Sequence, residues 1–209
     1  MKIAYQGISG SYSESCAKEN YPNCETIPCK TFDECFEKAN KDKTIKTIIP
    51  ESNKTTGNIG VEYLIFKYRL NIYAEHFFPI KHNLLGLRGS KLNDIKNVYS
   101  HAQALSQSSE FIKKNNFNEN VRADTAGSAK YISEDKDITK AAIASDLSAK
   151  IYNLEIIKKN IQDDKNNVTR FLIMGKDIYQ PELKNEKYIT SFLFKLKSKP
   201  AALYSALSG

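Results

Sequence analysis

The tripeptide Thr169-Arg170-Phe171 places a hydroxyl beside a guanidinium, between a polar loop and an apolar strand. A guanidinium can clamp a carboxylate through two parallel hydrogen bonds, because its N–H donors form a rigid planar fork. A neighbouring hydroxyl can donate a hydrogen bond to an oxygen that departs with negative charge. The pattern favours chemistry on a small anion, although three residues alone carry little specificity.

Four loops rich in small polar residues support this interpretation, because each follows an expected strand and opens an expected helix. They are residues 7–13, 50–57, 100–103 and 124–128. Ligands of open α/β sheets bind outside the carboxyl ends of the strands. Helix N-termini at that edge offer unpaired N–H groups and the positive end of the helix dipole. With a net charge of +7, these loops indicate a small anionic ligand; the alternative is that their Ser and Thr residues only cap helices.

Within the third loop, Ser100, Gln103 and Gln107 follow an i, i+3, i+7 spacing. Residues at this spacing share one face of a helix, so we expect all three to point into a cleft. The histidines His76 and His82 are scattered along the chain, as is His101, and we interpret each as a packing or capping residue rather than a base.

Short strands and helices alternate along the chain, which predicts an α/β fold with largely parallel sheets. Strands are expected at 2–5, 25–28, 44–49, 97–99, 121–123, 141–144, 154–157 and 171–174. Helices are expected after the capping residues Ser11, Thr31, Ser100 and Asp124, and at 59–68 and 146–152. Pro50 is expected to end the third strand. The long extended stretch 70–87 predicts a crossing between two lobes.

Composition and motifs exclude several classes of protein. No run of apolar residues approaches the roughly 18 needed to span a membrane. The lysines are scattered rather than clustered on one face, which argues against a nucleic-acid partner. Glycine-rich nucleotide motifs and metal-ligand spacings are absent from the sequence. Cys16, Cys24, Cys29 and Cys35 are expected to be reduced thiols, and the polar N-terminus predicts a cytoplasmic protein.

A wider pattern around the tripeptide resembles the signature of prephenate dehydratases. It comprises Tyr152-x-Leu154, Ile157, Asp163 and Thr169-Arg170-Phe171-Leu172-x-Met174. Further blocks similar to that family are 6–13, 100–107, 124–129 and 142–145. The resemblance extends over residues 1–176, in order and without large gaps. One block departs from the family: Ser52 and Lys54 stand where the family carries Glu and Ser, and Glu51 lies one place early. Ser108 also replaces a family Cys, which removes thiol chemistry there.

The resemblance implies decarboxylating dehydration of prephenate to phenylpyruvate, water and carbon dioxide, without metal or organic cofactor. Thr169 is the expected catalytic hydrogen-bond donor, and Arg170 is expected to stabilise the anionic substrate or orient the threonine loop. The other expected substrate-binding residues are Asn53, Ser100, Gln103, Gln107, Ser11, Thr125, Asn167 and Phe171. Ser11 and Thr125 begin helices and are expected to hold the pyruvyl group. The alternatives are arogenate dehydratase, or a non-catalytic module that binds small anions.

The implied fold is α/β, of the two-lobed periplasmic-binding-protein type II kind, with the site in the cleft between the lobes. We expect lobe one at residues 1–75 and 167–178, lobe two at 76–166, a linker at 179–186, and the first strand and helix of an ACT regulatory domain at 187–209. That last segment is shorter than such a domain, so we expect the chain to be a piece of a longer protein. The family also implies phenylalanine as an effector of a complete ACT domain only, and a homodimer or homotetramer. Neither nucleic acid nor membrane is expected as a partner.

Overall fold

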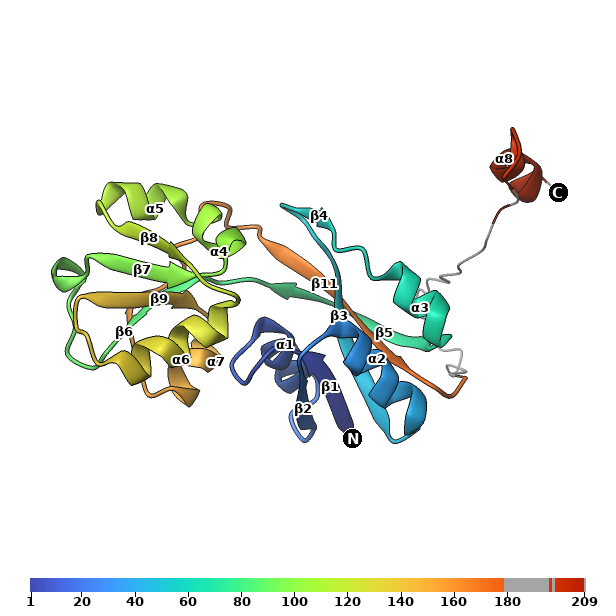
Figure 1. Ribbon diagram of the computed structural model, residues 1–209, viewed down its shortest axis with the longest axis horizontal. Helices are drawn as coiled ribbons and strands as arrows, with labels where there is room; N and C mark the ends of the chain where they lie inside the picture. Colours follow the sequence, from blue (N-terminus) through green and yellow to red (C-terminus); the bar gives the residue numbers. More distant parts are fainter. Residues whose placement is uncertain (179–195, 197, 209) are drawn as a thin grey trace, which may run out of the picture. The chain divides into compact units, whose positions relative to one another are not determined.

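The computed structural model describes residues 1–178, 196 and 198–208. They divide into two compact units, Met1–Tyr179 and Gln180–Gly209. The first unit holds two β-sheets, each covered by helices (Figure 1). The expected α/β fold with two lobes is therefore confirmed.

The first sheet has the strand order β2-β1-β3-β11-β5, and β4 pairs with β3. Its strands are β1 (Lys2–Gln6), β2 (Glu25–Cys29), β3 (Ile45–Asn53), β4 (Gly57–Asn58), β5 (Asn71–Pro79) and β11 (Val168–Gly175). Successive side chains of a strand point to opposite faces, so β1 contributes Ile3 and Tyr5 to one core and Ala4 to the other. Helix α1 (Tyr12–Asn20) covers the first face, and α2 (Phe32–Lys41) and α3 (Glu62–Tyr68) cover the second.

The second sheet has the order β10-β6-β9-β7-β8. Its strands are β6 (Asn83–Gly86), β7 (Asn97–Ser100), β8 (Asn118–Val121), β9 (Lys140–Ala144) and β10 (Glu155–Lys158). One face packs against α4 (Ala102–Ser106) and α5 (Ser109–Lys114) through Leu105 and Ile112. The other face packs against α6 (Thr125–Asp135) and α7 (Asp146–Ile151). A short 3-10 helix, η1 (Leu92–Asp94), lies between β6 and β7.

The chain passes between the two sheets twice, after β5 and before β11. The backbone N–H of Ile80 donates to the carbonyl of Asn167 at 2.8 Å, and that of Ile161 donates to the carbonyl of His82 at 2.8 Å. β5 and β11 run side by side toward these crossings (Figure 1). Because β5 stays paired with β11 as far as Pro79, the first lobe extends beyond the expected residue 75.

Two expectations about the strands were wrong. The sheets are mixed rather than largely parallel, because β11 runs antiparallel to both β3 and β5, and β6 runs antiparallel to β9 and β10. Pro50 does not end β3, which continues to Asn53. β1 pairs with β3 only as far as Ile48, and β4 pairs with it only from Ser52, so Pro50 has a strand partner on the β11 side alone. A proline, which lacks an N–H, fits such a one-sided position.

The helix starts are largely as predicted. Ser11, Thr31 and Asp124 each accept a hydrogen bond from a backbone N–H of the first helical turn. The cap of α4 is His101, however, not Ser100, which ends β7. The helix expected at 59–68 begins only at Glu62, the strand expected at 121–123 lies at 118–121, and α5 and η1 were not predicted.

The described helices include none with the length and apolar character of a membrane span. All four cysteines are free, and burial raises the pKa of Cys16 to about 12. The described residues contain no group of metal-ligating side chains suited to an ion.

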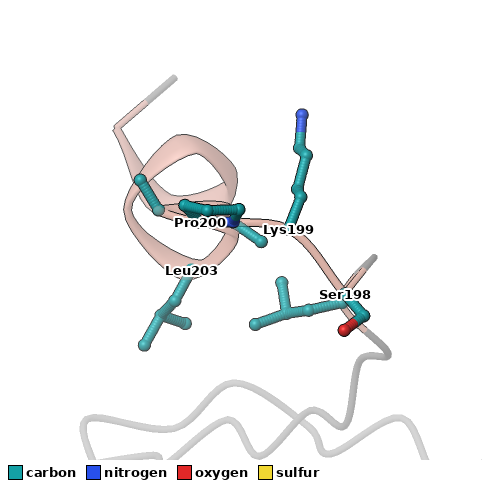
Figure 2. A pocket seen from close by; sticks show the side chains of 7 residues that line it. Ser198, Lys199, Pro200 and Leu203 are labelled. Atoms are coloured by element: carbon teal, nitrogen blue, oxygen red, sulfur yellow. The ribbon is translucent and has the colours of Figure 1, made fainter.

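In the second unit, α8 (Ala202–Leu207) follows a bend at 198–199 and a turn at 200–201. Figure 2 shows the side chains of this turn around a cavity of about 510 Å³, which is lined by Leu196, Ser198, Lys199, Pro200, Ala201, Ala202 and Leu203. A helix lies where one was expected near residue 200. The expected linker 179–186 and the strand expected at 188–196, apart from Leu196, lie outside the described residues, so the ACT domain stays a prediction.

Candidate active site

Thr169 lies on β11 between two strands, opposite Asn53 of β3 and Phe78 of β5. Its side chain is buried, with the residue 6% exposed. The amide Nδ2 of Asn53 donates a hydrogen bond to Thr169 Oγ1 at 2.8 Å. The residue expected to be catalytic therefore lies beside a residue expected to bind substrate.

The orientation of the Asn53 amide follows from the backbone of the β3–β4 turn. Asn53 Oδ1 accepts hydrogen bonds from the backbone N–H groups of Thr55, at 2.9 Å, and Thr56, at 3.3 Å. A backbone N–H can only donate, so the oxygen of Asn53 faces the turn and the nitrogen faces Thr169. The oxygen of Thr169 is thus an acceptor. Among the described residues, the hydroxyl of Thr169 donates no hydrogen bond, which leaves its proton free for a ligand.

Three further residues expected in the site join this cluster. Asn53 Nδ2 also donates to Asn167 Oδ1 at 2.8 Å, and Asn167 Nδ2 donates to Gln107 Oε1 at 3.0 Å. Gln103 and Gln107 come from α4 and its C-terminus in the second lobe, yet they bond to the turn of the first lobe. Gln107 Nε2 donates to Thr55 Oγ1 at 2.6 Å, and Gln103 Nε2 donates to Thr56 Oγ1 at 2.9 Å. The structure therefore brings five expected residues together across the boundary between the lobes.

Thr55 and Thr56 were not singled out from the sequence, although both lie in the expected loop 50–57. Their role follows from the pairing of β3 with β4, which makes the loop a turn whose N–H groups face back toward Asn53. A polar loop in a sequence does not reveal which of its groups point inward.

Arg170 lies on the opposite face of β11 from Thr169, because the two are consecutive in a strand. Its Nε and Nη2 each lie 2.7 Å from Glu75 Oε2, and its Nη1 lies 3.3 Å from Glu51 Oε2. The guanidinium therefore already contacts two carboxylates of the protein, with its side chain 27% exposed. This corrects the expectation that Arg170 stabilises the substrate directly. Its contacts with Glu51 and Glu75 tie β11 to β3 and β5, and the other expectation, that Arg170 orients the threonine loop, stays a prediction.

The departure from the family at Glu51 and Ser52 coincides with a β-bulge. Arg170 pairs with Ser52 and Phe171 pairs with Pro50, so Glu51 is the extra residue of β3. The bulge bends the strand locally, and the carboxylate of Glu51 still reaches Arg170. Glu51 also accepts a hydrogen bond from Ser52 Oγ at 2.6 Å.

Two residues expected to bind substrate have structural contacts instead. Ser100 is fully buried and its hydroxyl donates to the carbonyl of Ile143 at 2.6 Å, which ties β7 to β9. Phe171 is 2% exposed and packs edge-on against Phe78 in the core beneath α1. Neither side chain is accessible to a ligand in this structure. The expectation of direct contacts is therefore corrected, and Ser100 does not share the helix face of Gln103 and Gln107.

Ser11 and Thr125 begin helices as expected, but the structure does not bring them into the cluster around Thr169. Ser11 Oγ accepts from the N–H of Glu14, and Asp124 caps α6 at the N–H of Gly127. The carboxylate of the buried Glu14 also accepts from the N–H of Gly10 at 2.7 Å. Carboxylates of the protein thus already occupy the start of both helices.

The polar loop before α1 is also held by the second lobe. Its carbonyls at Ser9 and Gly10 accept hydrogen bonds from the hydroxyls of Tyr152, Ser145 and Ser148, at 2.6–2.8 Å. Beside this contact lies a cavity of about 310 Å³, and Thr169 is not among its lining residues. They are Tyr12, Ser15, Lys18, Glu19, Phe78, Pro79, Lys81, Ser145, Asp146, Leu147 and Lys150.

The fold and this cluster define a two-lobed α/β protein with a polar site at the boundary between its lobes. The chain belongs to the prephenate dehydratase family, whose model matches residues 3–178. Its curated relatives include the chloroplastic arogenate dehydratase/prephenate dehydratase 2 of Arabidopsis thaliana, which is 39% identical over 209 residues, covering all of this chain and 55% of that protein. The chain spans about half the length of the curated relatives it matches.

Similar solved structures include a protein of this family and one with a different description. The prephenate dehydratase of Staphylococcus aureus subsp. aureus Mu50 is 26% identical, with a TM-score of 0.78 over all of this chain and 78% of that one. A structure described as GqqA, a novel type of quorum quenching acylase, is 28% identical, with a TM-score of 0.84 over 99% of this chain and 76% of that one.

Proposed function

We propose that this protein converts prephenate to phenylpyruvate, water and carbon dioxide. The observation that carries the proposal is the geometry of Thr169, whose oxygen accepts a hydrogen bond from Asn53 and whose proton has no acceptor among the residues that the structure describes. The side chain is nearly buried and lies where residues of both lobes meet. A ligand bound at this position could accept one hydrogen bond, from the hydroxyl of Thr169.

The reaction needs such a donor at the leaving hydroxyl. The bond between the ring and its carboxylate breaks, and its electron pair forms a ring double bond while the C–O bond opposite breaks. Carbon dioxide leaves as a neutral molecule, the ring becomes aromatic, and the departing hydroxide takes up a proton to become water. Thr169 donates a hydrogen bond to this oxygen as negative charge develops on it. A threonine hydroxyl is too weak an acid to transfer its proton fully, so the proton itself comes from water or neighbouring groups.

The position of Arg170 suits this reaction. A carboxylate clamped by a guanidinium is stabilised as an anion, whereas the ring carboxylate has to lose its charge. A site of low polarity favours that loss. With Arg170 held by Glu51 and Glu75 on the other face of β11, the cluster around Thr169 consists of neutral hydroxyl and amide groups.

Arogenate is the alternative substrate, since it carries an amino group where prephenate carries a keto group and loses the same two fragments. The curated relative from Arabidopsis thaliana is named for both activities. Competition between the two substrates in one assay distinguishes them. Another alternative is a module that binds small anions without catalysis, which predicts binding of prephenate with no product.

The test is an assay of phenylpyruvate and phenylalanine formation from the two substrates, with the wild type beside Thr169→Ala and Thr169→Ser. We expect the wild type to form product from at least one substrate, and Thr169→Ala to lower turnover at least about a hundredfold, the range found for one lost transition-state donor. Thr169→Ser keeps a hydroxyl and should retain more of the activity. Near-normal turnover of Thr169→Ala would remove Thr169 from the mechanism.

The remaining expectations stay predictions. They are phenylalanine as an effector of a complete ACT domain, a homodimer or homotetramer, and a cytoplasmic location. The Arabidopsis thaliana relative is described as chloroplastic.

A further inference from the structure

His82 lies in the first crossing between the sheets and joins the two lobes through its ring. The residue is 2% exposed. Its Nδ1 lies 2.7 Å from the hydroxyl of Tyr12 at the start of α1, and its Nε2 lies 2.9 Å from Gln107 Oε1 at the end of α4. Its backbone N–H donates to the side chain of Gln162 in the second crossing. The sequence suggested only a packing or capping histidine.

The hydrogen bonds between Thr169 and His82 have a single consistent direction. The backbone of Thr55 and Thr56 turns the Asn53 nitrogen toward Asn167, so Asn167 must present its oxygen there. Asn167 then presents its nitrogen to Gln107, so Gln107 must present its oxygen. Reversal of any one amide would set two N–H groups, or two oxygens, against each other.

This direction determines which nitrogen of His82 carries the proton. Gln107 Oε1 can only accept, so His82 Nε2 must be the donor. Burial lowers the pKa of His82, which keeps the ring neutral near pH 7. In a neutral ring Nδ1 is then the acceptor, and Tyr12 is its donor at 2.7 Å. The same hydroxyl lies 3.0 Å from the carbonyl of Lys81, so the shorter contact with His82 shares or takes its one proton. Burial raises the pKa of Tyr12 well above its usual value, so its hydroxyl keeps its proton.

We propose that His82 and Tyr12 are positioning residues for Thr169: the Nε2–H tautomer of His82, whose Nδ1 accepts a hydrogen bond from Tyr12, holds Gln107 and Asn167 in the orientation that leaves the Thr169 proton free for the leaving oxygen. The proposal rests on the proposed function. It adds two residues that touch neither the substrate nor Thr169. Tyr12 belongs to the first lobe and Gln107 to the second, so the bonds on His82 form only when both lobes are in place.

Two amide variants of His82 distinguish hydrogen bonding to Gln107 from packing, because each keeps one of the two ring contacts. In His82→Gln the amide nitrogen takes the place of Nε2 and can still donate to Gln107. In His82→Asn the shorter amide reaches only the place of Nδ1, so the contact with Tyr12 survives and the donor to Gln107 is lost. We expect kcat of His82→Gln to exceed that of His82→Asn by about tenfold, the rate effect of a small change in hydrogen-bond energy. KM and the melting temperature should change similarly in the two variants. Equal kcat values, or losses that follow the melting temperature, would overturn the proposal.

A second measurement needs no activity. Long-range ¹H–¹⁵N spectra of the wild type at pH 7 report the tautomer of each histidine ring. We expect His82 to be neutral with its proton on Nε2, and the ¹⁵N shift of its acceptor Nδ1 to change in Tyr12→Phe, which removes the donor. A proton on Nδ1, or a charged ring, would overturn the proposal. A wild type that converts neither substrate would instead refute the proposed function, while the spectra would still decide the direction of these hydrogen bonds.

Discussion

Thr169 and Arg170 are neighbours in the sequence, but they face opposite sides of β11 and meet opposite environments. On one side, the hydroxyl of Thr169 lies among the amides of Asn53, Asn167 and Gln107, and in the described part of the chain its proton has no acceptor. On the other side, the guanidinium of Arg170 contacts the carboxylates of Glu51 and Glu75. The guanidinium of Arg170 is thus paired with carboxylates of the protein. The hydroxyl of Thr169 can still donate a hydrogen bond to a ligand.

This difference shows that the two residues cannot act together on one atom of a substrate. A hydroxyl and a guanidinium in adjacent positions suggest a joint anion site, but the alternation of a strand separates them. Arg170 instead links β11 to β3 and β5, the strands that carry the partners of Thr169. We therefore expect Arg170 to affect activity indirectly, by keeping β3, β5 and β11 in the positions that place Thr169 beside Asn53.

Among variants that test this difference between the two faces of β11, we expect Asn53→Asp to lower activity the most. The carboxylate has the shape of the amide and can still accept the N–H groups of Thr55 and Thr56, so the turn should be preserved. It cannot donate to Thr169, and it would accept the Thr169 proton instead. We expect kcat to fall by about 10²–10³-fold, as for loss of a transition-state donor. The melting temperature should fall too, because the carboxylate sets an oxygen against the buried Asn167 Oδ1.

Steady-state kinetics and thermal unfolding of the same preparation check this prediction. Asn53→Ala is the matched control, because it removes the donor without supplying an acceptor. If Asn53→Asp were no slower than Asn53→Ala, the direction of the bond to Thr169 would not matter.

The next effect concerns the other face of β11. Arg170→Met leaves Glu51 and Glu75 without their cation, and we expect the free energy of unfolding to fall by about 1–2 kcal/mol, since these side chains are partly exposed and water screens part of the interaction. kcat should fall by less than about tenfold, because no contact with the substrate is lost. Urea unfolding and kinetics measure the two effects.

The triple variant Arg170→Met, Glu51→Gln, Glu75→Gln is the control for this prediction. Removing the two carboxylates should recover part of the lost stability, because the repulsion between them is gone. A loss of kcat as large as that of Asn53→Asp, at unchanged stability, would place Arg170 on the substrate.

The sequence was informative where a pattern maps directly onto local geometry. The capping residues Ser11, Thr31 and Asp124 mark helix starts because each side chain bonds to a nearby N–H. The long extended stretch with Pro79 predicted the crossing between lobes. The family resemblance brought Asn53, Gln103, Gln107 and Asn167 to the same site as Thr169, and the structure places them there.

The predictions that were wrong or incomplete concern residues whose contacts come from segments distant in the sequence. Whether Pro50 ends a strand depends on whether β1 still pairs with it. Whether Arg170 is free depends on Glu75, a residue of another strand. Ser100 was placed on the helix of Gln103, but the strand β7 extends through it and buries its hydroxyl. His82 was set aside because no local motif surrounds it, and its partners Tyr12 and Gln107 come from both lobes.

The smallest effect, on the pH dependence of stability, is expected at Glu14. Its carboxylate, like the guanidinium of Arg170, is charged and hydrogen-bonded within the protein. Burial alone would raise the pKa of this carboxyl, but hydrogen bonds from Lys18, the Gly10 N–H and Thr26 outweigh it, and the pKa is lowered. The folded protein therefore binds fewer protons at this group than the unfolded chain does below its usual pKa of about 4.3. The stability it contributes is present above that pH and is lost as the pH falls through the lowered value.

Glu14→Gln should accordingly flatten the dependence of the urea midpoint on pH in the acid range. The substitution also weakens the bond that holds the Gly10 N–H, so some stability is lost at pH 7 as well. Urea titrations at a series of pH values measure both effects. A slope equal to that of the wild type would mean that Glu14 titrates alike in the folded and unfolded chain. In that case Arg170, paired with Glu51 and Glu75, would be a clearer example than Glu14 of a charged side chain stabilised by contacts within the protein.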